Sequence, residues 1–448
     1  MFKKMVLVVA VTLLMVSASS TSRMETINSQ MPRNGSARQY MYTPEAGITV
    51  ADAKKYLRSV MPTSEEAKNF LSGKQGPDNI SYNDGWVYDP HLGWVVCDSV
   101  RPRFGERYKG VYLPYGTGGS RTFYHYEADG ARKVINFADK PCRIHTYGNS
   151  FTHCDQVNDG ETWQEYLAAH IQEPIRNYGV GGYGVYQAYM RMLKVEQQSP
   201  AKYLILNIYD DDHYRNLDAW RSIRWWYTEP GARWACGYTL PHLKVNIRQN
   251  HCEQIENLLS TPDDVYKLCD ESFVWQTFRD DPILRVVMAL RGGDKACSKL
   301  AEPIAESFGA PIETVTEANA AEQIRRIHTE AALFATKNII TWTEQFVQQN
   351  DRKLMIILSF SQGRVAADLR GEPRFDQGLV NWLKNKPYPV IDMRDLFRAD
   401  YKQYNLDVGA YLKRYYIGHH SPAGNFFTAW AIKDEVVEWL EPPPLPYR

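Results

Sequence analysis

The chain has 448 residues, and 44% of them are hydrophobic, which is enough for two or three domains with a proper core. Lys plus Arg and Asp plus Glu both number 52, so the formal net charge is zero. This balance gives no reason to expect nucleic acid or an anionic membrane as a partner.

The N-terminus predicts a secretory signal peptide over residues 1–20. Lys3 and Lys4 precede a short apolar run from Met5 to Val16, and small residues follow at positions 17–20. The run is too short to span a bilayer comfortably, so a retained anchor is the weaker interpretation. We therefore expect a secreted or periplasmic protein that has no membrane contact after cleavage.

An exported protein can form disulfides, and this chain has seven cysteines. The odd number leaves at least one thiol free or intermolecular. No Cys-x-x-Cys pair occurs, so a zinc site built on thiolates is not expected. The best candidates for pairing lie close together in the chain: Cys236, Cys252, Cys269 and Cys297.

Residues 21–140 form a lead-in followed by a small β-rich region. The segment 21–39 is polar and without periodicity, and residues near 50–72 have a helical pattern. From residue 82 to 137, short aromatic and β-branched runs alternate with turn signals such as Asn83-Asp84-Gly85. A substrate-binding platform and a packing appendage are both open interpretations of this region.

Residues 141–448 alternate between strand and helix patterns. Trp163, Leu167 and Ile171 recur at a spacing of four and give one apolar helical face. Such alternation predicts the α/β class, with a doubly wound, mostly parallel sheet and helices on both faces. Strands are expected at 203–209, 354–360 and 389–393, and helices at 185–197, 330–349 and 375–384.

The last predicted helix covers residues 424–440. Phe426, Trp430 and Val437 lie on one of its sides. We expect that side to pack on the sheet.

Residues 142–152 contain the first candidate for chemistry. The apolar-alternating segment stops at Gly148 and presents Ser150. A serine at the carboxyl end of a buried parallel strand is a candidate nucleophile, because it points into the crevice where α/β folds bind ligands. A single Gly-x-Ser turn is a weak signal. Three further blocks follow it: a glycine-rich run at 177–184, the acidic run Asp210-Asp211-Asp212-His213, and Gly418-His-His-Ser-Pro-Ala-Gly-Asn425.

With these four blocks in this order, the chain resembles the SGNH (GDSL-like) hydrolase superfamily over roughly residues 140–440. The resemblance implies a flavodoxin-like α/β domain, here with a long helical insert at about 214–330. It implies that Ser150 is the nucleophile and that His419 is the base. It also implies that the backbone N–H groups of Ser150 and Gly182 bind the oxyanion. Asn149 stands where the family has Asp, and its side chain can make similar bonds to the backbone.

The third block departs from the family pattern. Asp211 stands where the family has an asparagine that donates to the oxyanion, and an ionised Asp211 would repel that charge. Three explanations stay open: Asp211 is protonated, a neighbour such as His213 donates instead, or the reaction differs. The acidic run as a solvated loop or a cation site is a further alternative.

The fourth block also departs from the family, because Tyr416 occupies the place of the carboxylate that orients the histidine. Either Ser150 and His419 act as a dyad with a backbone carbonyl as the orienter, or a carboxylate comes from elsewhere. The candidates for that carboxylate are Asp392, Asp395, Asp407 and the Asp210–Asp212 run.

The insert opens with a dense group of aromatic and guanidinium side chains. Such groups suit stacking on sugar rings and pairing with carboxylates or sulfates, which would place the insert over the serine as a glycan-binding rim. The alternative is that the tryptophans form the core of a helical subdomain. The candidate substrate-binding residues are Trp220, Arg221, Arg224 and Trp225, with His420 from the fourth block.

These features predict a secreted serine esterase that removes acyl groups, above all acetyl, from a carbohydrate through an acyl-enzyme. Such a reaction needs no cofactor. One alternative is acyl transfer to a glycan, and another is a non-catalytic glycan-binding protein on an esterase scaffold. A lipase is the weaker interpretation, because the insert is rich in Arg and Trp rather than in aliphatic residues.

Overall fold

The computed structural model describes residues 42–71, 86–89, 93–96, 111–113, 122–228 and 239–448. The predicted signal peptide and the polar lead-in lie outside the described residues, as do Cys97 and Cys236. Among the helices of the described ranges, none is long and apolar enough to cross a membrane.

A five-stranded parallel sheet is the centre of the molecule. Its strand order is β11-β10-β7-β5-β6, and every neighbouring pair is parallel. Ile144 of β5 pairs with Ile175 on one side and with Tyr203 on the other. This is the order of flavodoxin-like doubly wound sheets, and it confirms the predicted α/β class with a mostly parallel sheet. The strands are β5 (Ile144–Tyr147), β6 (Ile175–Asn177), β7 (Tyr203–Tyr209), β10 (Lys353–Ser359) and β11 (Val390–Asp392).

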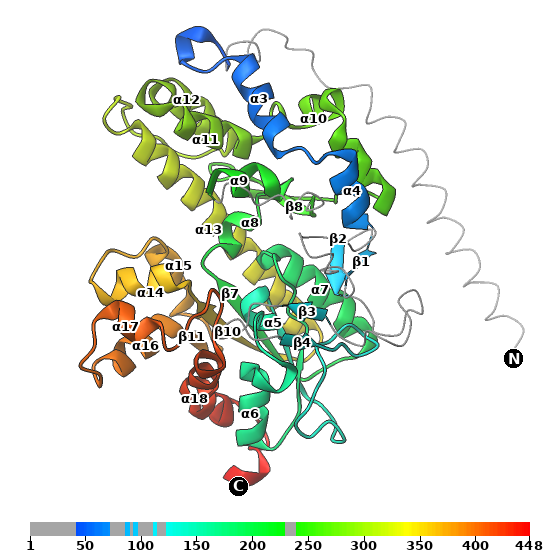
Figure 1. Cartoon of the computed structure of the whole chain (residues 1–448). Coiled ribbons are helices and arrows are strands. Elements are labelled where there is room, and N and C mark those ends of the chain that lie inside the picture. The colour runs from blue at the N-terminus through cyan, green and yellow to red at the C-terminus, as the bar shows by residue number, and fades with distance from the viewer. Residues whose placement is uncertain (1–41, 72–85, 90–92, 97–110, 114–121, 229–238) are drawn as a thin grey trace, which may run out of the picture.

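Helices cover both faces of this sheet. Since β6 and β7 flank β5 on opposite sides, right-handed crossovers place α6 (Trp163–Ile171) and α7 (Val185–Gln198) on opposite faces. The C-terminal helix α18 (Pro422–Trp439) packs beside α6, and α13 (Ala320–Gln349) packs beside α7 (Figure 1). The other helices of this part are α5 (Ser150–His153), α8 (Asp212–Arg215), α14 (Gln362–Leu369), α15 (Gln377–Leu383), α16 (Met393–Tyr401) and α17 (Val408–Leu412), with the 3-10 turns η6 (Asp159–Glu161) and η9 (Leu445–Tyr447).

The predicted buried side of α18 is wrong. Phe426 and Trp430 are 48% and 53% exposed, whereas Phe427 and Ile432 are buried. The helix carries apolar residues around most of its circumference, so periodicity alone does not select the face that packs against α6.

The N-terminal part contains helices and short strand pairs. The helical pattern near 50–72 is two helices, because Pro62 follows Met61, whose ψ of 137° is extended. The elements are η3 (Pro44–Ala46), α3 (Val50–Val60) and α4 (Ser64–Leu71), followed by the antiparallel pairs β1 (Trp86–Asp89) with β2 (Gly93–Val96) and β3 (Val111–Leu113) with β4 (Thr122–Tyr124).

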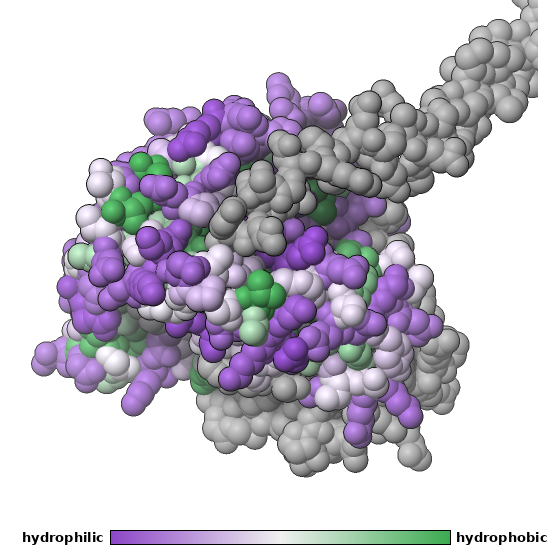
Figure 2. Space-filling model, turned by 90° about the horizontal axis from the view of Figure 1, so that it is seen from above, coloured by the Kyte–Doolittle hydropathy of each residue, from purple (hydrophilic) through white to green (hydrophobic). Residues whose placement is uncertain are grey.

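Between α8 and α13 the chain forms the mostly helical insert. Its face seen from above is largely hydrophilic, and the hydrophobic patches there are small and separate (Figure 2). The insert consists of α9 (Arg221–Thr228), the hairpin β8 (His242–Asn246) and β9 (His251–Ile255), η8 (Pro262–Cys269), α10 (Glu271–Phe278), α11 (Pro282–Arg291) and α12 (Gly293–Ser307).

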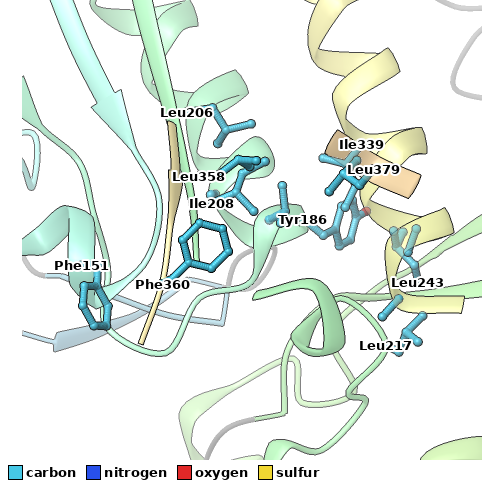
Figure 3. Close-up of a cluster of buried hydrophobic side chains, with 14 of the residues drawn as sticks. Phe151, Tyr186, Leu206, Ile208, Leu217, Leu243, Ile339, Leu358, Phe360 and Leu379 are labelled. Carbon is cyan, nitrogen blue, oxygen red and sulfur yellow. The ribbon is translucent and has the colours of Figure 1, made fainter. Parts of the chain in front are cut away.

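One hydrophobic core continues from the sheet into the insert. Leu206 and Leu358 from the sheet, Ile339 from α13 and Leu243 from the insert belong to the same buried cluster (Figure 3). The 30-residue helix α13 contacts the sheet strand β10 as well as α11 and α12, so it joins the two parts.

The described cysteines are all free thiols. Cys142, Cys154, Cys252, Cys269 and Cys297 form no disulfide. Three of the four cysteines that were expected to pair are therefore unpaired, and the fourth, Cys236, lies outside the described residues.

Candidate active site

Ser150 stands at a tight turn at the carboxyl end of β5. Gly148 is required there, because a Cβ would come within 2.1 Å of Thr152 Oγ1 and 2.5 Å of the Asn207 carbonyl oxygen. Asn149 caps α5: its Oδ1 accepts a hydrogen bond from the Phe151 N–H at 2.8 Å. The Asn149 Nδ2 donates to Asp212 Oδ1 at 2.8 Å. An Asp at position 149 would face the Asp212 carboxylate, which accounts for an amide at this position.

The structure brings His419 to the serine. The His419 Nε2 lies 2.8 Å from Ser150 Oγ, although the two residues are 269 positions apart in the chain. His419 sits in a turn closed by the Ile417 N–H donating to its carbonyl oxygen at 2.9 Å. Tyr416 anchors this turn to the sheet through a 3.0 Å hydrogen bond from its hydroxyl to the Phe360 carbonyl oxygen. The two predicted catalytic side chains thus meet with the geometry of a nucleophile and its base.

Gln156 orients the histidine, which sequence patterns did not predict. The Gln156 Oε1 lies 3.0 Å from His419 Nδ1 and accepts the backbone N–H of His419 at 2.8 Å. Its Nε2 donates to the Ile417 carbonyl oxygen at 3.1 Å, which fixes which end of the amide faces the histidine. Because an amide oxygen only accepts, Nδ1 carries the proton and Nε2 is left to accept the serine hydroxyl.

The candidate orienting carboxylates have other partners. Asp392 binds Arg374 at 2.6 Å and caps α16, and Asp407 caps α17 by accepting the Ala410 N–H at 2.9 Å. Asp395 pairs with Arg398. The structure therefore places none of these three on His419, and the expectation that Asp392 or Asp407 orients it is not met.

The segment after α5 has an unusual backbone. Cys154 and Gln156 both have positive φ, 64° and 73°, which is costly for residues other than glycine. Arg132 holds this segment: its guanidinium donates to the carbonyl oxygens of His153, Cys154 and Val157 at 2.5–2.7 Å. The strained turn is what directs Gln156 toward His419.

The charge around His419 comes from neighbours beyond Gln156. Burial lowers the pKa of His419 below its ordinary value, Asp155 opposes that shift, and Arg215 adds to it. Asp155 itself binds the His153 Nδ1 at 2.5 Å. The low pKa keeps the His419 ring neutral, which is the form that accepts a proton.

Two backbone N–H groups are candidates for the oxyanion site. The glycine-rich loop after β6 lies against the nucleophile turn, because the Val180 N–H donates to the Gly148 carbonyl oxygen at 3.0 Å. Gly182 has a φ of +76°, which favours glycine. In the described part of the chain, neither the Ser150 N–H nor the Gly182 N–H donates to the protein. Arg221 binds the Gly182 carbonyl oxygen and so holds the loop.

Asp211 is not a member of the oxyanion site in this structure. It binds Arg215 at 2.8 Å and Arg224 at 2.7 Å. Burial alone would raise the pKa of Asp211, but Arg224 and Arg215 outweigh burial and hold that pKa well below its ordinary value. The two ion pairs therefore favour the ionised form of Asp211 over the protonated one. His213, the alternative donor, is buried with its Nδ1 2.9 Å from Thr336 Oγ1.

The residues expected to form a glycan-binding rim are buried instead. Trp220 packs against Phe278, with ring centroids 5.2 Å apart, and Trp225 lies between Arg215 and Arg221. The interpretation of these side chains as an exposed rim is thus wrong, because the carboxylates of Asp211 and Asp218 bind the arginines internally. The residues concerned are Trp220, Arg221, Arg224 and Trp225; of the same segment, Arg233 and Trp234 lie outside the described residues.

His420 is likewise buried and does not face solvent. Its ring contacts the Phe151 ring edge-on at 5.0 Å and the Tyr416 ring at 4.9 Å. Burial lowers the pKa of His420 to about 3, so it stays neutral. His420 is thus an aromatic packing residue next to His419.

Within the described ranges no group of three or more His, Cys, Asp or Glu side chains is arranged to hold a metal ion. Comparison of the sequence with protein-family models and with curated proteins found no match. The resemblance to SGNH hydrolases therefore rests on the four sequence blocks and stays a prediction.

Proposed function

We propose that this protein is a secreted serine esterase of the SGNH type that removes short acyl groups, above all acetyl, from a carbohydrate. The observation that carries the proposal is the 2.8 Å contact between Ser150 Oγ and His419 Nε2, with Gln156 bound to the other ring nitrogen at 3.0 Å. A serine paired with an oriented, neutral imidazole is the arrangement that acyl transfer needs.

The first half of the reaction forms an acyl-enzyme. Ser150 Oγ attacks the ester carbonyl carbon while its proton moves to His419 Nε2. The oxyanion that results is stabilised by the N–H groups of Ser150 and Gly182. His419 then gives the proton to the alcohol oxygen of the sugar, the bond from carbon to that oxygen breaks, and the sugar leaves.

The second half repeats these steps with water. His419 takes a proton from the water as its oxygen attacks the acyl carbon. The bond from that carbon to Ser150 Oγ breaks, and Oγ recovers the proton from His419. Gln156 keeps the proton on Nδ1 throughout, so Nε2 alone exchanges protons.

The surroundings of Ser150 favour a short acyl group. The Phe151 ring stacks on Tyr209, with centroids 4.4 Å apart, and lies 5.0 Å from the His419 ring. Ser150 itself is only 7% exposed. These rings occupy the space beside the nucleophile, which supports acetyl over a long chain.

The test is covalent labelling of the purified mature protein with an active-site serine phosphonate, with the adduct located by peptide mass spectrometry. We expect the label on Ser150, and we expect it to disappear in Ser150→Ala and in His419→Ala. The matched control is Ser298→Ala, at a half-buried serine of α12 whose hydroxyl binds only backbone in the described residues, and it should label like the wild type. If Ser150 takes no label and a chromogenic acetyl ester is not cleaved either, the proposal is rejected.

A further inference from the structure

Asp210, Ser361 and Arg364 lie beside the candidate active site and have no role in it. Asp210 directly follows β7, and Ser361 is the N-cap residue of α14, which follows β10. Since β7 lies between β5 and β10 in a parallel sheet, these residues share the carboxyl edge of the sheet with Ser150. This is the edge at which open α/β sheets bind ligands.

The connection to the nucleophile is short. Tyr209 precedes Asp210 and stacks its ring on Phe151, the residue after Ser150, with centroids 4.4 Å apart. Asp210 is thus the chain neighbour of a residue whose ring contacts the neighbour of Ser150.

Asp210 is a buried carboxylate with one oxygen unsatisfied. The residue is 7% exposed, and its Oδ2 accepts the Ser361 hydroxyl at 2.8 Å. Its Oδ1 has no hydrogen-bond partner. Burial raises the pKa of Asp210 to about 6, so the group is ionised in mildly alkaline buffer. An unpartnered buried carboxylate oxygen is costly and is relieved by a donor.

Arg364 supplies a donor that is also unused. Its Nε lies 3.7 Å from Asp210 Oδ2, which is beyond hydrogen-bond distance. Its guanidinium makes no hydrogen bond within the part of the chain that the structure describes, and its side chain is 45% exposed. The guanidinium lies over the Phe375 ring at 4.5 Å, which holds it in place. Arg374, by contrast, has carboxylate partners at 2.6–2.8 Å.

We propose that Asp210, Ser361 and Arg364 form a subsite for the sugar ring that carries the acyl group, in which a free hydroxyl bridges the Asp210 carboxylate and the Arg364 guanidinium. A hydroxyl accepts from Arg364 Nε and donates to Asp210 Oδ2, which can accept a second hydrogen bond beside that of Ser361, and an oxygen about 2.8 Å from each of these two atoms fits between them at their separation of 3.7 Å. The carboxylate disfavours an anion and the guanidinium disfavours a cation, so the pair selects a neutral ring. This inference rests on the proposed esterase function.

The test compares a sugar ester with an ester that has no sugar. We measure kcat/KM at mildly alkaline pH for mono-O-acetylated methyl pyranosides and for nitrophenyl acetate. For each protein, the value for the pyranosides is divided by the value for nitrophenyl acetate. We expect this ratio to fall about 10-fold or more in Arg364→Met and in Asp210→Asn, mainly through KM for the pyranosides. The control is Arg370→Met at the other end of α14, where the arginine is exposed and binds only Glu372, and it should keep the wild-type ratio.

An unchanged ratio in both variants, or an equal loss on both esters, would overturn the subsite. If the wild type cleaves neither ester, the esterase proposal fails, and the subsite is judged by binding instead. The same pyranosides are then titrated calorimetrically into Ser150→Ala and into Ser150→Ala with Arg364→Met. Weaker binding by the second protein supports the subsite, and equal or absent binding rejects it.

Discussion

At the scale of single residues, the unusual feature is that a neutral side chain orients the candidate base His419. Gln156 fixes the tautomer of His419 as a carboxylate would, yet it adds no negative charge next to the ring. The negative charge near the ring comes from Asp155. Its carboxylate binds His153 and acts on His419 through its charge, without a hydrogen bond to the His419 ring. Orientation and electrostatic support are thus divided between two adjacent residues.

This division predicts a pH profile. Since burial lowers the pKa of His419 from 6.5, the neutral base persists to below that pH, and kcat/KM should fall only as pH drops through the lowered value. Gln156→Glu places a carboxylate beside Nδ1 and favours the imidazolium, which should move the acid limb of kcat/KM upward by about 1 pH unit or more. Gln377→Glu adds the same charge at an exposed position of α15 and should leave the limb in place. An acid limb that does not move in Gln156→Glu would show that the amide does not orient His419.

At the scale of elements, two arginines hold the two loops that build the site. Arg132 comes from the segment after β4 and holds the strained turn that carries Gln156. Arg221 comes from α9 of the insert and holds the Gly182 loop. The N-terminal region and the insert therefore support the site by packing and hydrogen bonding, one from a segment before β5 and the other from a segment after β7.

Loss of the hydrogen bonds from Arg132 to the segment after α5 should destabilise the protein. Arg132→Met removes one donor from each of three buried carbonyl oxygens and the charged partner of Asp159, which we expect to lower the free energy of unfolding by about 3–5 kcal/mol. Denaturant unfolding measures the change. Arg58→Met removes an exposed ion pair with Glu271 that solvent screens, so it should leave the free energy of unfolding nearly unchanged. Equal changes in the free energy of unfolding for the two substitutions would contradict this role of Arg132.

Loss of the Arg221 contact should affect the transition state more than substrate binding. With Arg221→Met the Gly182 loop is released, so its N–H is no longer aimed at the oxyanion, and kcat should fall about 10-fold or more with little change in KM. Arg221→Lys keeps a positive charge beside Asp218. This variant therefore tests the positioning of the Gly182 loop without leaving Asp218 unpaired. A rise in KM at unchanged kcat would contradict a role at the oxyanion.

At the scale of the whole molecule, sheet and insert share one hydrophobic core. The buried cluster runs from α3 through the insert to the strands, and α13 contributes to both parts. The ion pairs between Asp211 at the end of β7 and Arg224 of α9 join the same two parts. Neither part buries its apolar face without the other.

A shared core predicts cooperative unfolding. Leu284→Ala in α11 and Leu206→Ala in β7 remove fully buried side chains, and each should cost about 2–5 kcal/mol. By calorimetry, both variants should show a single transition at a lowered Tm, because the insert and the sheet unfold together. A separate early transition in Leu284→Ala, with the sheet intact, would show that the insert is an independent unit.

Much of the architecture follows from local sequence patterns. The apolar run of β7 and the four-residue spacing of Trp163, Leu167 and Ile171 predicted elements that the structure contains, because strand and helix periodicity are properties of neighbouring residues. The turn after β5 marked Ser150 as a candidate nucleophile, and the resemblance to a known family marked His419 as its candidate base; the structure places the two side chains 2.8 Å apart.

Tertiary structure alone decided the features that depend on contacts between distant segments. Gln156 reaches His419 across 263 residues, and no local pattern marks an amide as the orienter. The ionisation of Asp211 is set by Arg224, which comes from another helix, and the burial of Trp220 and Trp225 depends on which face the insert turns to the core. Charge state and burial are properties of the surroundings in space, so the sequence determined which groups are present and the fold determined what each of them can do.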